Sequence, residues 1–495
     1  MQFDISEAIQ HWGVFRKSAI AIRSARESVS YETLDRRATR VASVLTRAVD
    51  AHTRVALMIS DKPQFLTALI GILRAGNSVV LLNQLLGPEA LQKCITDAKV
   101  RNVVVDDYFN NLLNASSRRM LKLKKLLYHG NRLRGNHLRQ TRLSNIFPVA
   151  RPEDEWGVFY SSGTTGIPKG IVRDHYSVVT ELLGWCLDLG LNFQSSFFIG
   201  RPLYYTGGLV LSLSTLLAGG CIGVDEKSDW PAYDSYVKKH RVDFAFFVPD
   251  QLREFVRSAK QSGSAVRGAK QVLVMGGNIS AGEKRDAART LHSMVIESWG
   301  NSEGLGTITS PGDLRRRPKS IGRPFLTDRM FIVDSKGKQL PTGRIGRIAG
   351  GVEAAFSRYC NKPKATNAAK KKDLIVSDDY GYVDSAGYFY IVGRSDDLIT
   401  SGDRPTFTSA VETVLRRHRS VRECAVVNVG KRAGPARLVG FVVLEPSRRS
   451  PSEILRATNA RLSSRLRLQS ITTVQSLPRN AAGKVDKAAL LESAL

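Results

Sequence analysis

Apolar and polar positions alternate along the first hundred residues in two different periods. Between residues 34 and 45, apolar side chains recur every three or four positions, the spacing of a helix with one buried face. Residues 55–59, 79–82 and 103–105 are uninterrupted apolar runs of the length of a buried strand. Pro88 stands where a further helix begins, in its first turn. This alternation predicts a parallel sheet covered by helices, and therefore the α/β class.

The pattern changes twice further along the chain. Residues 321–351 are rich in glycine and short apolar stretches, which predicts a small β subdomain. Residues 362–372 form a polar connection rich in Lys and Ala. A second α/β pattern then begins at Asp396, with a predicted helix across residues 454–466. The 495 residues therefore predict several domains or subdomains.

A basic stretch at residues 108–152 interrupts the first pattern. It has no Asp or Glu and ten Lys or Arg, and we expect a surface helix and loop there. The whole chain carries a formal net charge of +28, which favours nucleic acid, acidic lipid or an acidic protein as a partner. A solvated basic face is the simpler interpretation. No nucleic-acid motif accompanies the charge, so we do not expect nucleic acid as a partner.

The cysteines and the hydropathy profile predict a cellular compartment. The five cysteines are scattered without the spacing of a metal or redox motif, which is typical of reduced thiols in a cytoplasmic protein. The N-terminus lacks the pattern of a secretory signal, and no stretch has the length and composition of a membrane span.

Candidate chemistry is densest just after the apolar run at residues 156–160. A loop of Ser, Gly and Thr follows this predicted strand and ends in Pro-Lys-Gly. Glycines let backbone N–H groups approach phosphate oxygens, hydroxyls add donors, and Lys169 supplies a cation. The loop residues expected to hold a nucleotide are Ser161, Ser162, Gly163, Thr164, Thr165, Gly166 and Lys169.

The string from Tyr160 to Gly170 resembles the phosphate-binding signature of the adenylate-forming superfamily, which includes acyl- and aryl-CoA ligases. Residues 299–303 are similar to the family's next nucleotide-binding block. By this resemblance the ring of Trp299 and Gly300 would line the adenine site, and Ser302 would lie near the phosphates. Glu303 would hold Mg²⁺.

Further motifs follow in the family's order. Gly276, Gly277 and Asn278 resemble the turn that lines the adenine and acyl pockets. Asp379 matches the acid that binds the ribose hydroxyls, and Arg394 matches the arginine near ribose and phosphate. The resemblance therefore implies ATP and Mg²⁺ as cofactors.

The last motif, at residues 478–484, resembles the family's C-terminal Pro-x-x-x-x-Gly-Lys block and makes Lys484 the expected catalytic lysine, beside Glu303. The family's hinge falls at Asp396. The implied architecture is a large N-terminal domain at residues 1–395, with helix-flanked sheets and a β-barrel-like subdomain, and a small mobile C-terminal domain at residues 396–495.

The acyl pocket and the acceptor are less completely specified. Tyr204, Tyr205 and Thr206 occupy the block that contacts the acyl group in the family. An α-amino acid activator carries an Asp nearby, where Thr206 stands, so we expect a fatty or aromatic acid. The family usually has Gly at the position of Asp403, in a loop that borders the thiol tunnel.

This departure leaves CoA and the phosphopantetheine of an acidic acyl or peptidyl carrier protein open as acceptors. A second class of function is a degenerate family member that binds an acyl ligand or nucleic acid without catalysis. The presence of Lys169, Glu303, Asp379 and Lys484 favours the enzyme.

Overall fold

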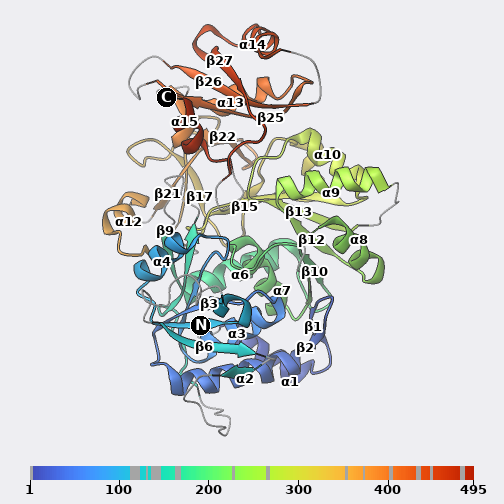
Figure 1. Ribbon diagram of the computed structural model, residues 1–495, viewed down its shortest axis with the longest axis vertical. Coiled ribbons are helices and arrows are strands. Elements are labelled where there is room, and N and C mark those ends of the chain that lie inside the picture. Colours follow the sequence, from blue (N-terminus) through green and yellow to red (C-terminus); the bar gives the residue numbers. More distant parts are fainter. Residues whose placement is uncertain are drawn as a thin grey trace. The chain divides into compact units, whose positions relative to one another are not determined.

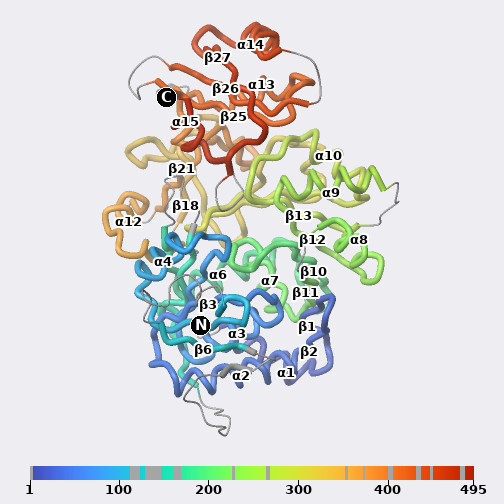
Figure 2. Tube along the Cα trace, viewed as in Figure 1, coloured from blue at the N-terminus to red at the C-terminus, as the bar shows by residue number. Residues whose placement is uncertain are grey.

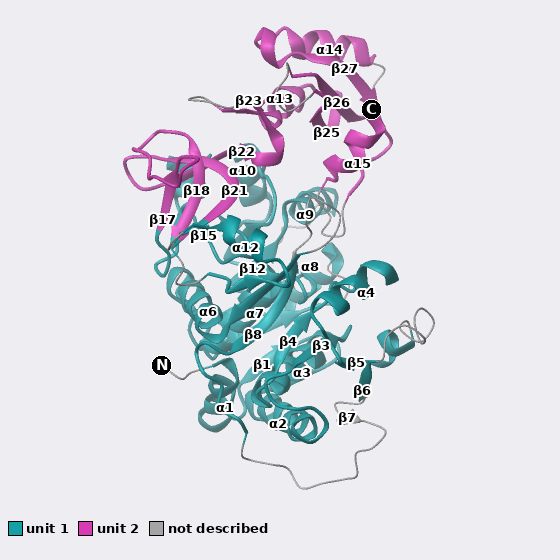
Figure 3. Cartoon of the chain, turned by 90° about the vertical axis from the view of Figure 1, so that its left-hand side faces the viewer, with its two compact units in different colours: residues 1–161, 169–329, 351–375 teal, residues 162–168, 330–350, 376–495 magenta. Residues whose placement is uncertain are grey.

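The computed structural model describes residues 4–111, 123–129, 132–134, 147–161, 169–225, 229–262, 268–351, 355–371, 374–400, 405–430, 436–445, 450–479 and 485–494. The chain forms two compact units (Figure 3). Unit 1 comprises Met1–Ser161, Lys169–Arg329 and Gly351–Ile375, and unit 2 comprises Ser162–Pro168, Met330–Gly350 and Val376–Leu495. The predicted domain boundary at residue 395 lies inside unit 2 and remains a prediction.

One sheet of unit 1 contains the phosphate-loop strands. Its described strands follow the order β19-β9-β8-β4-β3-β5-β6-β7, and β3, β4 and β5 confirm the three predicted apolar strands. Gly157 is required in β8, because a Cβ there would lie 2.6 Å from the backbone oxygen of Val79 in β4. The strands are β3 (Arg54–Met58), β4 (Ser78–Leu81), β5 (Asn102–Val105), β6 (Lys124–His129), β7 (Arg132–Arg134), β8 (Glu155–Ser161), β9 (Lys169–Asp174) and β19 (Arg358–Tyr359).

The second sheet of unit 1 follows the order β16-β15-β14-β13-β12-β10-β11-β1-β2 in the described residues. Its central strands β11, β10, β12, β13 and β14 pair in parallel, so their carboxyl ends share one edge. The strands are β1 (Ile20–Arg23), β2 (Ser28–Ser30), β10 (Ser196–Ile199), β11 (Cys221–Val224), β12 (Phe244–Phe247), β13 (Gln271–Met275), β14 (Met294–Gly300), β15 (Gly306–Ile308) and β16 (Arg323–Pro324).

Helices connect and cover the strands of unit 1 (Figure 1). Leu57 of one sheet and Phe197 of the other belong to the same buried cluster as Leu34 and Leu66 of α2 and α3, so the two sheets share a core. The helices are α1 (Ile5–Phe15), α2 (Tyr31–Ala48), α3 (Lys62–Arg74), α4 (Pro88–Asp97), α6 (His175–Leu189), α7 (Thr206–Leu217), α8 (Trp230–Lys239), α9 (Pro249–Ser262), α10 (Ala281–Thr290), α11 (Asp313–Arg316) and α12 (Pro363–Ala369).

The structure corrects the expectation for one connecting segment and adds detail to another. A surface helix and loop are expected at 108–152, and residues 107–111 are helical, but β6 and β7 also lie within the stretch and extend the first sheet beyond β5. Leu126 and Tyr128 are buried on β6. The burial of these apolar side chains stabilises a strand although lysines stand in the same stretch. The polar connection at 362–372 contains helix α12, which begins at Pro363, and the short strand β20 (Lys370–Lys371).

Unit 2 contains the predicted β subdomain and the C-terminal α/β pattern. The β subdomain is one sheet, and β20 joins it at the start of β21. Its other strands are β17 (Met330–Val333), β18 (Gly346–Gly351), β21 (Leu374–Val383) and β22 (Phe389–Arg394). The α/β fold class, which was predicted from the alternation of helix and strand patterns, is confirmed.

The C-terminal part of unit 2 is red in Figure 2, where α14 runs beside β27. The helix predicted across residues 454–466 ends earlier than expected, since the last residue of α14 is Asn459. The elements are η1 (Ser395–Asp397), β23 (Leu398–Thr400), β24 (Thr406–Phe407), α13 (Thr408–Leu415), β25 (Val421–Asn428), β26 (Leu438–Leu444), α14 (Pro451–Asn459), η2 (Ser464–Leu466), β27 (Leu468–Thr473) and α15 (Lys487–Ala494). Among all described residues, none of the helices combines the length and apolar content that a bilayer crossing requires.

Candidate functional site

The predicted phosphate loop connects two paired strands. β8 ends at Ser161 and β9 begins at Lys169, and these two residues pair across the antiparallel ladder. The loop therefore leaves and re-enters the sheet at directly opposed positions. The predicted loop residues Ser162, Gly163, Thr164, Thr165 and Gly166 lie outside the described residues, as does the side chain of Ser161.

Glu303 follows β14 and is oriented by a tyrosine. The hydroxyl of Tyr359 donates to Glu303 Oε1 at 2.7 Å, and the backbone N–H of Phe356 donates to Glu303 O at 2.8 Å. Glu303 is half-buried and forms no ion pair with any described residue. The Tyr359 hydroxyl and the Phe356 N–H therefore hold this residue, and no cationic side chain among the described residues pairs with its carboxylate.

Tyr359 also contacts the predicted phosphate cation. Lys169 Nζ lies 5.7 Å from the centre of the Tyr359 ring, within the range of a cation–π interaction. Residue types alone did not identify Tyr359. It reaches this position because β19 pairs with β9, with Tyr359 opposite Ile171, and local sequence patterns do not encode such a long-range pairing.

The predicted adenine-site residues lie at the carboxyl edge of the second sheet. Trp299 and Gly300 end β14, and Trp299 is half-buried. Gly276 follows β13 directly with φ of 96°, a conformation that favours glycine. Because β13 and β14 are adjacent parallel strands, these residues share one edge of the sheet, where open α/β folds bind ligands.

Two further residues complete this edge. Ser302 is half-buried and lies in the turn after β14, while Gly277 and Asn278 are exposed after β13. The backbone oxygen of Asn278 accepts from Arg253 Nη2 at 2.8 Å, which fixes the end of the turn.

The predicted acyl-pocket residues lie at the start of α7. The rings of Tyr204 and Tyr205 are 4.7 Å apart, and Thr206 is the first residue of the helix. Burial, followed by the influence of Tyr205, raises the pKa of the Tyr204 hydroxyl, which therefore stays neutral. A Cβ at Gly207 would lie 2.5 Å from Met275 Cε, so the start of α7 directly contacts the end of β13. The structure thus places Tyr204–Thr206 near the Gly276 turn.

In unit 2, the predicted ribose residues form a pair of their own. Asp379 and Arg394 are opposite each other on β21 and β22, and Arg394 Nη1 donates to Asp379 Oδ1 at 3.2 Å. Burial acts to lower the pKa of Arg394, but the carboxylates of Asp379 and Asp378 outweigh it, so the net pKa is raised and the guanidinium stays charged. Asp396 lies two residues later, in the turn η1.

The end of the chain is anchored to the residues around the predicted hinge. Lys487 Nζ lies 2.7 Å from Asp397 Oδ1 and 2.7 Å from Glu412 Oε1. Arg479 and Val485 form an antiparallel bridge. Lys484, between these two residues, lies outside the described part of the chain.

A family profile for AMP-binding enzymes matches residues 9–359, and a profile for the AMP-binding enzyme C-terminal domain matches residues 410–484. The chain is 26% identical to the 4-chlorobenzoate–CoA ligase of Arthrobacter sp, over 97% of this chain and 94% of that protein. It is also 26% identical to the 3-hydroxybenzoate–CoA ligase of Aromatoleum sp. (strain CIB), over 95% of this chain and 93% of that protein.

Among solved structures, the fold matches O-succinylbenzoate coenzyme A synthetase (MenE) from Bacillus subtilis, in complex with ATP and magnesium ion. The TM-score is 0.87 at 20% identity, over 98% of each chain. The resemblance inferred from the motifs is confirmed: the chain belongs to the family of AMP-binding enzymes.

Proposed function

We propose that this enzyme uses ATP to convert a carboxylic acid to its acyl-adenylate with release of pyrophosphate, and then transfers the acyl group to the thiol of CoA. The observation that carries the proposal is the arrangement around Tyr359, where Glu303 accepts from the hydroxyl and Lys169 lies over the ring. One oriented carboxylate, together with the ammonium of the lysine that follows the Ser/Gly/Thr loop in sequence, suits a nucleoside triphosphate with its metal. The names of the ligase relatives support the same reaction.

Charge neutralisation is the main task of these residues. The attacking carboxylate and the triphosphate are both anions, so the barrier falls when fixed positive groups surround the phosphates. We assign Lys169 and the loop to the β- and γ-phosphates, and Lys484 to the approach of the carboxylate to the α-phosphorus. By the resemblance to the family, Trp299 and the Gly276 turn would contact adenine, and Asp379 and Arg394 are assigned to the ribose.

The donor set around Glu303 fits Mg²⁺. No group of three or more His, Cys, Asp or Glu residues in the described ranges could hold a metal. Mg²⁺ commonly binds through one or two carboxylates together with substrate phosphates and water, which matches a single oriented carboxylate. When bound there, Mg²⁺ would neutralise phosphate charge, and the carboxylate of Glu303 would hold it.

An aromatic acid is the proposed substrate class. The rings of Tyr204 and Tyr205 lie 4.7 Å apart and are tilted by 46°, and a Cβ built on Gly207 would meet Met275 Cε and the Phe246 ring, so aromatic and thioether groups gather at the start of α7. The two relatives named above act on substituted benzoates by their names. Neither the described residues nor these relatives give support for an acidic carrier protein as acceptor, so we propose CoA.

The cytoplasm is the proposed location, because none of the five cysteines forms a disulfide.

A panel of benzoates, fatty acids and α-amino acids in the ATP–pyrophosphate exchange assay tests the proposal. We expect exchange with at least one benzoate, little with α-amino acids, and formation of AMP and a thioester when CoA is added. Acyl transfer only to a carrier protein would reject CoA as the acceptor. Binding of acids or RNA without any exchange would instead favour the non-catalytic alternative.

A further inference from the structure

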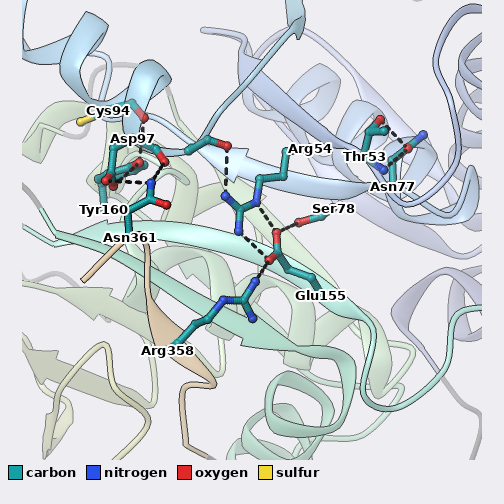
Figure 4. A network of polar contacts seen from close by, with 11 residues as sticks. Thr53, Arg54, Asn77, Ser78, Cys94, Asp97, Glu155, Tyr160, Arg358 and Asn361 are labelled. Atoms are coloured by element: carbon teal, nitrogen blue, oxygen red, sulfur yellow. Dashed lines mark hydrogen bonds and ion pairs between the residues drawn. The ribbon is translucent and has the colours of Figure 1, made fainter. Parts of the chain in front are cut away.

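The segment from Arg358 to Asn361 contacts several parts of the phosphate-site frame. Arg358 Nη2 donates to Glu155 Oε2 at 2.9 Å, at the start of β8. The backbone N–H of Cys360 donates to Gly170 O at 2.8 Å, next to Lys169. Asn361 Nδ2 donates to the backbone oxygen of Asp97 at 2.6 Å. This short segment therefore joins both loop strands and the end of α4 (Figure 4).

Partly buried polar contacts connect the loop strands with the end of α4 and with this segment. The hydroxyl of Tyr160 lies 2.7 Å from Cys94 O and 3.0 Å from Asp97 Oδ2, one residue before the end of β8. A Cβ on Gly170 would lie 3.1 Å from Asp97 Oδ2 and from Cys360 Sγ, so β9 is close to the same groups. Figure 4 shows Tyr160 and Asn361 converging on Asp97. The strands that enter and leave the loop thus share one anchor.

The Glu155 side of the network anchors the other end of β8. Arg54 forms a bidentate contact with Glu155, with Nε–Oε1 of 2.5 Å and Nη2–Oε2 of 2.7 Å. Ser78 donates to Glu155 Oε1 at 2.8 Å, and Arg358 completes the set (Figure 4). Arg358 thereby links the segment that carries Tyr359 to the start of β8.

Tyr359 is the residue of this segment that faces the proposed reaction. Its side chain is 7% exposed, and its backbone N–H donates to Thr366 Oγ1 of α12 at 3.0 Å. The hydroxyl holds Glu303 Oε1, and the ring lies beneath Lys169. The Tyr359 side chain therefore contacts both the carboxylate of Glu303 and the ammonium of Lys169.

We propose that Tyr359 is a positioning residue that sets the Mg²⁺ affinity of the nucleotide-bound enzyme by orienting Glu303. This inference rests on the proposed function. The hydroxyl donates to Oε1, and the carboxylate that it orients would hold the metal. Removing such a supporting hydrogen bond typically weakens metal binding by about 10–100-fold. The ring contact with Lys169 is independent of the hydroxyl and is retained in phenylalanine.

The test measures Mg²⁺-dependent binding of α,β-methylene ATP, an analogue that is not cleaved between its α- and β-phosphorus atoms. For wild type and Tyr359→Phe, the midpoint of thermal unfolding is followed as Mg²⁺ is added at saturating analogue. We expect the half-maximal Mg²⁺ concentration to rise by about 10-fold in the variant. Unfolding without ligand and Mg²⁺-free binding of the analogue should remain close to wild type.

Tyr31→Phe is the matched control, because Tyr31 is fully buried and its hydroxyl donates to Gly220 O at 2.6 Å, within a different part of unit 1. This control should leave the half-maximal Mg²⁺ concentration unchanged. In a Glu303→Gln background, Tyr359→Phe should add no further shift, because the carboxylate through which it acts is already absent.

An unchanged Mg²⁺ requirement in Tyr359→Phe would overturn the inference. Equal weakening of analogue binding with and without Mg²⁺ would also overturn it, because Tyr359 would then support the pocket as a whole. If wild type shows no stabilisation by the analogue at any Mg²⁺ concentration, the proposed function itself fails. The wild-type titration therefore separates the two failures.

Discussion

Glu303→Gln is expected to lower carboxylate-dependent pyrophosphate exchange by about 100-fold or more. The substitution keeps the shape of the side chain and can still accept from Tyr359, but it removes the negative charge proposed to hold Mg²⁺. The loss should be partly offset at high Mg²⁺, because weakened metal binding is restored by mass action. Initial exchange rates over a range of Mg²⁺ concentrations measure both effects.

Glu254→Gln provides the control for this variant. Glu254 is an exposed carboxylate of α9 that pairs with Arg257, and a surface pair of this kind contributes little to stability. Its exchange rate should equal that of wild type. A Glu303→Gln enzyme with full activity at low Mg²⁺ would remove Glu303 from the metal site.

Lys484→Ala is expected to abolish measurable pyrophosphate exchange while ATP binding persists. The lysine is proposed to act where the carboxylate meets the α-phosphorus, so its loss should raise the barrier rather than weaken nucleotide binding. The segment that contains it is anchored on both sides, by the Arg479–Val485 bridge and by the contacts of Lys487 with Asp397 and Glu412. A single substitution at Lys484 should therefore leave the neighbouring fold intact.

Exchange kinetics together with thermal stabilisation by ATP and Mg²⁺ distinguish the outcomes for Lys484. Lys93→Ala is a suitable control, since Lys93 is exposed and pairs only with Glu89 among the described carboxylates. Wild-type exchange by Lys484→Ala would contradict its proposed role. Loss of exchange together with loss of stabilisation by ATP would indicate a binding role instead of a catalytic one.

The strands predicted from continuous apolar runs are present in the structure, because burial on both faces leaves a plain signal in the sequence. β3, β4 and β5 are examples. β6 was missed because lysines begin it and only alternate residues, such as Leu126 and Tyr128, are buried. The many basic residues of this stretch made the alternation of buried and exposed positions, which is typical of a strand, hard to recognise in the sequence.

The candidate site was predictable where chemistry is encoded in short motifs. Trp299, Glu303 and the Gly276 turn were predicted through their resemblance to the family's motifs, and in the structure they follow or end adjacent parallel strands, while their roles stay predictions. Tyr359 and Asp97 were not identified. Their contacts depend on β19 pairing with β9 and on α4 ending beside Tyr160, and neither arrangement is visible in a local stretch of sequence.

The transfer of an oxygen atom from the acid to AMP tests the central claim most directly. The reaction is run with an acid active in the exchange assay, labelled with ¹⁸O in its carboxylate, together with ATP, Mg²⁺ and CoA. If the acid attacks the α-phosphorus, one carboxylate oxygen becomes the bridge of the acyl-adenylate and leaves with AMP when the thiol attacks the acyl carbon. We predict AMP that carries one ¹⁸O and pyrophosphate that carries none. Label in orthophosphate with formation of ADP, or unlabelled AMP beside the thioester, would contradict it.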